Sequence, residues 1–118
     1  MKTLTLLLLL LPCFAAAEQL APQKEIAALI EFVRNSPCRF NRNGSWYASG
    51  EAVGHINSKY HAAFDKGLVH SAEDFIHYAA STSSFTGTPY KVQCAGRAER
   101  TCADWLTAEL QRLRERNN

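Results

Sequence analysis

The stretch CRFNR at residues 38–42 alternates apolar and polar side chains, which is typical of a half-buried β-strand. The stretch YKVQC at residues 90–94 alternates in the same way. If the two strands pair antiparallel with Cys38 opposite Cys94, the apolar side chains share one face and the polar side chains share the other. Facing residues of such a pair lie at the separation that a disulfide accepts. The sequence therefore predicts a short two-stranded antiparallel pair closed by a Cys38–Cys94 disulfide.

The N-terminus has the three parts of a secretory signal peptide. A positive start at Lys2 is followed by an apolar run at residues 4–11 and by the small residues AAA, which end at Ala17. The apolar run is shorter than the roughly 18 to 20 residues that span a bilayer. We therefore expect cleavage between Ala17 and Glu18 during export to the periplasm, with no stable membrane span left afterwards.

The remaining residues, 18–118, are predicted to form a single periplasmic domain, as their number suits one modest core. The full chain has 13 basic and 11 acidic residues, and loss of Lys2 with the leader leaves 12 and 11. Such a balanced charge lacks the concentrated basic face that a nucleic-acid partner requires. We expect a monomer that binds no nucleic acid.

The cysteine count forces a choice of disulfide partners. Cys13 lies in the leader, and the proline before it disfavours lipidation there, so Cys38, Cys94 and Cys102 remain. Export into an oxidising compartment favours one disulfide. Closing the larger loop, between Cys38 and Cys94, stabilises by roughly 4 kcal/mol, against about 2.5 kcal/mol for Cys94 with Cys102. Cys102 is then a spare cysteine, or a reactive thiol if the start of the last helix lowers its pKa.

Four segments have the spacing of helices with one buried face. They begin near Pro22, Ser49, Ser71 and Thr101, the last two as capping boxes with aspartate at the third following position. Their predicted core residues are Ile26, Leu29, Ile30 and Val33; Ala52, Val53, Ile56, Tyr60, Ala63 and Phe64; Ala72, Phe75, Ile76 and Ala79; and Trp105, Leu106, Leu110 and Leu113. The predicted fold class is α+β, with about four helices packed on the disulfide-linked two-stranded pair.

Four further sequence features occur together: CRFNRNGSWY at residues 38–47, Glu51-Ala52 with His55, AEDFI at residues 72–76, and the segment 81–90. In this combination the chain resembles the YfeK-like family of small exported bacterial proteins. The resemblance spans nearly all of the exported part. It implies a periplasmic domain of unknown function and no particular reaction.

Glu51, His55 and Lys59 lie four residues apart on the predicted second helix, so their side chains form one line on its surface. A glutamate beside a histidine can orient it as a general base. The alternative is a solvated helix face with weak ion pairing. No nucleophile is identifiable beside His55 in the sequence.

The loop STSSFTGTP at residues 81–89 is rich in hydroxyl groups. Ser83 or Ser84 within hydrogen-bond reach of His55 would make the chain a small serine hydrolase. However, the loop has neither phosphate-loop nor nucleophile-elbow spacing, and serine and threonine also favour ordered turns for backbone reasons. We therefore assign no catalytic residue and treat the hydrolase as an alternative.

The histidines have no metal-ligand spacing, and no cysteine forms a redox Cys-x-x-Cys or a haem-attachment motif. The sequence therefore predicts no metal site and no cofactor.

Two large aromatic residues, Trp46 and Tyr47, follow a tight Asn-Gly turn and an arginine. Exposed, they are typical anchors for a protein or glycan partner, and buried, they are core. The predicted binding surface consists of Arg39, Asn41, Arg42, Trp46, Tyr47, Ser81, Ser83, Ser84, Thr86 and Tyr90.

We therefore expect a small binding or accessory module of the cell envelope, of an inhibitor-like or immunity-like kind, which acts on a periplasmic protein or a glycan. The inhibitor and immunity roles rest on analogy with other small exported proteins. The alternatives are the hydrolase and a structural protein associated with the cell wall.

Overall fold

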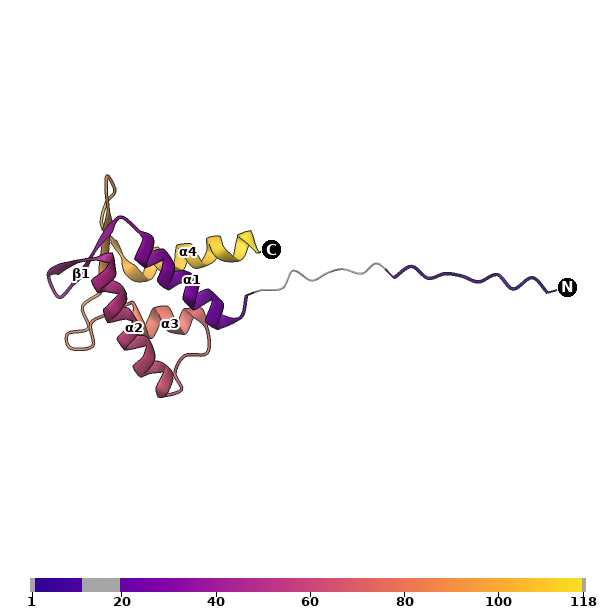
Figure 1. Ribbon diagram of the computed structural model, residues 1–118, viewed down its shortest axis with the longest axis horizontal. Coiled ribbons are helices and arrows are strands. Elements are labelled where there is room, and N and C mark those ends of the chain that lie inside the picture. The colour runs from indigo at the N-terminus through magenta and orange to yellow at the C-terminus, as the bar shows by residue number, and fades with distance from the viewer. Residues whose placement is uncertain (1, 12–19, 118) are drawn as a thin grey trace.

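The structure is a computed structural model that describes residues 2–11 and 20–117. The predicted cleavage point between Ala17 and Glu18 lies outside these residues, as does Cys13. Residues 2–11 contain no helix or strand, and their leucines are exposed. Figure 1 shows this segment directed away from the rest of the chain. In the part of the chain that the structure describes, no helix is both long enough and apolar enough to cross a membrane.

The sheet is antiparallel and has four strands in the order β2-β1-β3-β4. The strands are β1 (Cys38–Arg42), β2 (Ser45–Ala48), β3 (Lys91–Cys94) and β4 (Arg100–Thr101). The predicted register is confirmed, because Cys38 faces Cys94 and Phe40 faces Val92. The predicted disulfide is also confirmed, and it joins residues 56 apart in sequence whose Cα atoms are 4.1 Å apart.

The prediction of only two strands was wrong. Asn43 and Gly44 both have positive φ angles, 53° and 84°, which is the type I′ turn that closes a two-residue hairpin, so residues 45–48 fold back as β2 instead of forming a loop. Strand β4 has only two residues, too few to show any alternation in the sequence. The α+β class holds, with a larger sheet than expected.

The four helices are α1 (Pro22–Asn35), α2 (Ser49–Asp65), α3 (Ala72–Ala79) and α4 (Cys102–Arg116). Their predicted starts are confirmed. The Ser71 hydroxyl accepts a hydrogen bond from the Asp74 amide at 3.0 Å, and the Thr101 hydroxyl accepts one from the Asp104 amide at 3.2 Å. These caps satisfy amides that the first helical turn leaves free, which fixes where α3 and α4 begin.

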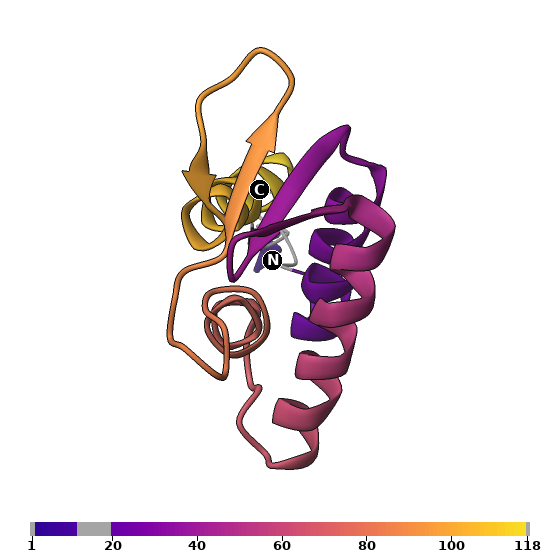
Figure 2. The ribbon, with the colours of Figure 1, turned by 90° about the vertical axis from the view of Figure 1, so that its left-hand side faces the viewer.

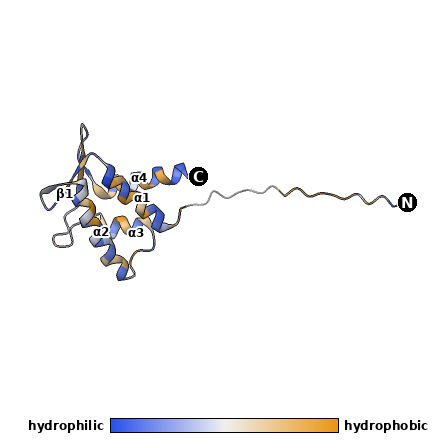
Figure 3. Cartoon of the chain, in the orientation of Figure 1, coloured by the Kyte–Doolittle hydropathy of each residue, from blue (hydrophilic) through white to orange (hydrophobic). Residues whose placement is uncertain are grey.

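One face of the sheet packs against the helices and the other face is open. Phe40 and Val92 belong to a core that includes Leu29, Phe75 and Leu106 from three different helices. Figure 2 shows α1 and α2 side by side along one flank, with the β3–β4 hairpin projecting beyond the other elements. Figure 3 shows hydrophobic residues on the helices and hydrophilic ones at the end of α4.

Phe64 is an exception among the predicted core residues, since 51% of its surface is exposed. It lies in the last turn of α2, and its place in the hydrophobic stripe did not make it a core residue.

Candidate functional site

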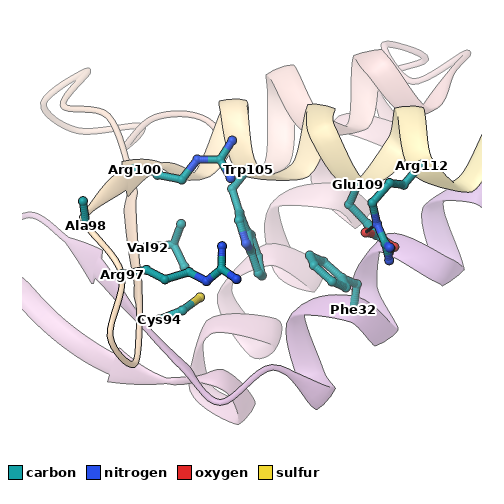
Figure 4. Close-up of a pocket in the computed structure, with 9 residues that line it drawn as sticks. All are labelled: Phe32, Val92, Cys94, Arg97, Ala98, Arg100, Trp105, Glu109 and Arg112. Atoms are coloured by element: carbon teal, nitrogen blue, oxygen red, sulfur yellow. Dashed lines mark hydrogen bonds and ion pairs between the residues drawn. The ribbon is translucent and has the colours of Figure 1, made fainter.

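A cleft of about 650 Å³ lies between the β3–β4 hairpin, α1 and the first turns of α4. We call it the α4 cleft. Its lining consists of Phe32, Val92, Cys94, Arg97, Ala98, Arg100, Trp105, Glu109 and Arg112. This volume is in the range of small-molecule sites, which run from about 300 to 1,000 Å³. Figure 4 shows the Trp105 indole at the centre of the cleft, with the arginines of the hairpin on one side and Phe32 on the other.

The apolar floor follows from local structure. Val92 points to the helix side of the sheet, and the β3–β4 register places Arg100 directly beside it on the same face. Trp105 is in the first turn of α4 and Phe32 is on α1, with ring centroids 4.5 Å apart. These side chains give the cleft an aromatic and aliphatic base.

The edge of the cleft is cationic. Glu109 is its single carboxylate, and this group already accepts hydrogen bonds from Arg112, the closer at 2.8 Å, while Arg116 lies 3.8 Å away. The hydrogen bond to Glu109, followed by the charge of that carboxylate, raises the pKa of Arg112 above its ordinary value. Arg97 and Arg100 have no acidic partner among the residues that the structure describes.

Glu99 lies between these two arginines in sequence but not in the cleft. Its carboxylate is 3.7 Å from the amino group of Lys91, a residue on the open face of the sheet. The hairpin therefore separates its charges, with the acidic group on one face and two guanidinium groups at the cleft on the other. Guanidinium groups in such an arrangement can donate hydrogen bonds to a negatively charged group.

The α4 cleft contains no obvious catalytic machinery. The residues that line it include no serine, threonine, histidine or free thiol, since Cys94 is part of the disulfide. Across the residues that the structure describes, no group of three or more His, Cys, Asp or Glu side chains is placed to hold a metal ion.

Glu51, His55 and Lys59 on α2 do not act as one group, because their side chains have different neighbours. Arg42 lies within hydrogen-bond distance of His55, 3.0 Å from its Nδ1, and the ring of Tyr47 packs edge-on against the imidazole. Lys59 instead donates to the Thr82 carbonyl and to the Tyr90 hydroxyl, the latter at 3.2 Å. Glu51 is exposed.

The hydroxyl-rich loop is held against the β1–β2 turn. Ser83 is 2% exposed, and its hydroxyl accepts a hydrogen bond from the Asn43 side-chain amide at 2.9 Å. The Thr86 hydroxyl donates back to the side-chain oxygen Oδ1 of Asn43 at 2.8 Å. The structure therefore brings Ser83 to Asn43, and among the described residues it pairs no serine with His55. Ser81 is half-buried and donates to a helix carbonyl at 2.6 Å, whereas Ser84 is exposed.

Of the ten residues of the predicted binding surface, the five on β1 and β2 divide between the two faces of the sheet. Arg39, Asn41 and Trp46 share the open face, where the Arg39 guanidinium lies 5.3 Å from the centre of the Trp46 ring. Arg42 and Tyr47 point to the helix side and reach His55. Ser83 and Tyr90 are buried and Thr86 is exposed.

The sequence analysis missed the α4 cleft because its residues come from three separate elements. Trp105 was assigned to the core, and only 8% of its surface is exposed. Arg97 and Arg100 were not singled out. A two-residue strand at residues 100–101 was the feature that would have placed Arg100 beside Val92.

A family model described as a family of unknown function, DUF5329, matches residues 20–114. The chain belongs to this family. The match covers all four strands and α1 to α3 in full, and α4 except for its last two residues. The DUF5329 match supports an uncharacterised family, as expected, but it does not support the YfeK-like name. No curated protein and no solved structure matches the chain.

Proposed function

We propose that the protein is a small exported binding module of the bacterial cell envelope and that it holds its ligand in the α4 cleft. The observation that carries this proposal is the combination of an aromatic floor with two guanidinium groups that have no acidic partner among the described residues. Sites of this composition bind ligands through burial of apolar surface and orient them through a few polar groups.

Export to the periplasm is supported by two features. The leucines within residues 4–11 contribute nothing to the core, as expected for a targeting segment. The Cys38–Cys94 disulfide is of the kind that persists in oxidising compartments. We propose that residues 1–17 are the signal peptide and that residues 18–118 form the exported domain.

Cell fractionation with intact mass measurement tests export. We expect the protein in the periplasmic fraction, with the mass of a chain that begins at Glu18 and lacks the two hydrogens lost in the disulfide. Recovery of the chain from the cytoplasm with residues 1–17 still attached would contradict this part of the proposal.

Binding in the cleft is tested with phenylnaphthylamine, a neutral apolar dye whose fluorescence rises when it leaves water. The blocking variant is Ala98→Trp, which places an indole at the cleft from an exposed position on the hairpin. The matched control is Ala95→Trp, in the same hairpin but lining a different hollow, beside Arg39 and Gln93. We expect the control to bind the dye as the wild type does and the blocking variant to lose at least about tenfold in affinity, because the added indole occupies the apolar volume. Equal binding by both variants would place the dye elsewhere.

A second candidate surface is the open sheet face of Arg39, Asn41 and Trp46. It is favoured by the exposed indole of Trp46, 36% accessible, stacked with a cation as in many protein and glycan contacts. Affinity capture from the periplasm tests it with Trp46→Ala and, as control, Phe64→Ala, which truncates an exposed aromatic residue on α2. Loss of a captured partner from the Trp46 variant alone supports this surface, and equal capture by both removes it.

A further inference from the structure

We infer that the α4 cleft selects anionic amphiphiles, that is, small molecules with one apolar chain or ring system and one anionic headgroup, and that Arg97 and Arg100 hold the headgroup. This inference rests on the proposed binding function and goes further, since it specifies the chemical class of the ligand and the residues that discriminate it.

The charge of the lining is the first support. Three arginines and one carboxylate line the cleft, and that carboxylate is already paired with Arg112. Glu99, the nearest acidic residue in sequence, is paired with Lys91 on the open face. Arg97 and Arg100 are therefore available to an external anion, and a guanidinium group donates two parallel N–H hydrogen bonds to the oxygens of a carboxylate or phosphate.

The floor of the cleft supports an apolar body for the ligand. Phe32 is half-buried and Trp105 keeps 8% of its surface exposed, so both offer some apolar surface to the cleft above the buried Val92. Burial of that surface is favourable at about 25 cal/mol per Å². A bare inorganic anion would make no use of this apolar surface. A ligand with an apolar part uses both the floor and the arginines.

The hydrogen-bonding capacity of the lining argues against a sugar. Guanidinium groups only donate, and both oxygens of Glu109, the one side-chain carboxylate in the lining, already face Arg112 or Arg116. The hydroxyl groups of a polyol would therefore meet one side-chain carboxylate in the cleft, and that group is already engaged by Arg112. An anion, which only accepts hydrogen bonds, matches a lining whose charged side chains, apart from Glu109, only donate them.

An extended peptide is also a poorer match. Peptides add to exposed sheet edges through a row of backbone hydrogen bonds, and the edge strand beside the cleft, β4, has only two residues. A small amphiphile needs no such row, so we commit to the small molecule as the occupant.

The test compares two dyes that share one ring system. Anilinonaphthalene sulfonate carries a sulfonate, and phenylnaphthylamine is the same molecule without it. We expect the sulfonate dye to bind about tenfold more tightly, since a hydrogen bond to a charged group contributes about a factor of ten or more. The preference should shrink as salt is added, because the arginines are near the surface.

The discriminating variants are Arg97→Gln and Arg100→Gln. Each should weaken the sulfonate dye by about three- to tenfold and leave the neutral dye unchanged. The control is Arg34→Gln, which makes the same change of charge on α1, where Arg34 pairs with Glu31 outside the cleft. Neither cleft arginine makes a side-chain hydrogen bond or ion pair among the described residues, so the variants should remain folded.

The outcomes separate this inference from the proposed function. If both dyes bind with equal affinity and the arginine variants change neither, the cleft binds apolar ligands but the anionic class is wrong. If neither dye binds, or both bind Ala98→Trp normally, the proposed cleft itself is wrong. Displacement of the sulfonate dye by decanoate supports the inference. Displacement by a short peptide ending in a free phenylalanine carboxylate, but not by decanoate, would overturn it in favour of a protein terminus.

Discussion

Cys102 is the buried free cysteine of the described chain, and its surroundings oppose ionisation. It occupies the first position of α4, where the sequence alone allows a lowered thiol pKa through the helix dipole. In the structure, desolvation by burial raises the pKa of the thiol from 9.0 to about 12. The burial outweighs the dipole here, and only the packing of the neighbouring elements reveals it.

Stability at alkaline pH is predicted to depend on this thiol. Because the pKa is raised in the folded state, the thiol's contribution is complete below about pH 9 and falls as the pH rises towards 12, while the unfolded chain ionises. Between about pH 9 and pH 10 the wild type should lose about 1 kcal/mol of unfolding free energy from this group. Denaturant unfolding of Cys102→Ala should show a smaller loss over the same interval, and identical losses in both proteins would contradict the assignment.

The sequence predicted helix caps well, but it predicted poorly which distant residues come into contact. Ser71 and Thr101 were identified as caps because a cap involves residues three positions apart. Arg97 and Arg100 carry no such local pattern. Their importance comes from Trp105 and Phe32, which the sequence places in other elements.

At the scale of elements, one arginine joins three helices. Arg114 on α4 donates two hydrogen bonds to Glu25 on α1, at 2.9 and 3.1 Å, and a third to Glu73 on α3. The bonds to Glu25 are the main cause of a raised pKa for Arg114. The Glu25 side chain is only 7% exposed, and the Arg114 guanidinium is its ion-pair partner.

Arg114→Met is predicted to cost about 2 kcal/mol of unfolding free energy, because it leaves the Glu25 carboxylate buried without a partner. The figure is below that of a fully buried pair since Arg114 itself is 36% exposed. Adding Glu25→Gln should recover part of the loss in urea unfolding. The control Arg116→Met, on an exposed arginine of the same helix, should change stability by less than about 0.5 kcal/mol. Equal effects of the two arginine substitutions would contradict a structural role for the Glu25 pair.

The strands show where sequence patterns stop being informative. Residues 38–42 and 90–94 alternate over five positions, which was enough to predict their pairing and register. Residues 45–48 contain two adjacent aromatic side chains, and the type I′ turn before them was the better indicator of a strand. Strand β4 exists because it pairs with β3 and leads into the cap of α4, which is a tertiary effect.

At the scale of the whole molecule, the disulfide and the α4 cleft share one region. Cys94 ends β3, lines the cleft and is bonded to Cys38, so the crosslink fixes the base of the projecting hairpin that carries Arg97 and Arg100. The sequence predicted the crosslink from two strands. It did not predict the cleft, since this requires the relative positions of α1, the hairpin and α4 together.

The two tryptophans of the chain report on the two candidate surfaces separately. Trp105 is at the floor of the α4 cleft and Trp46 is on the open sheet face. The most direct test is therefore an NMR titration of the folded protein with anilinonaphthalene sulfonate, observed at the two indole N–H signals. We predict that the Trp105 signal shifts in a saturable manner and that the Trp46 signal stays in place. A shift of the Trp46 signal with an unchanged Trp105 signal would contradict the assignment of the cleft as the binding site.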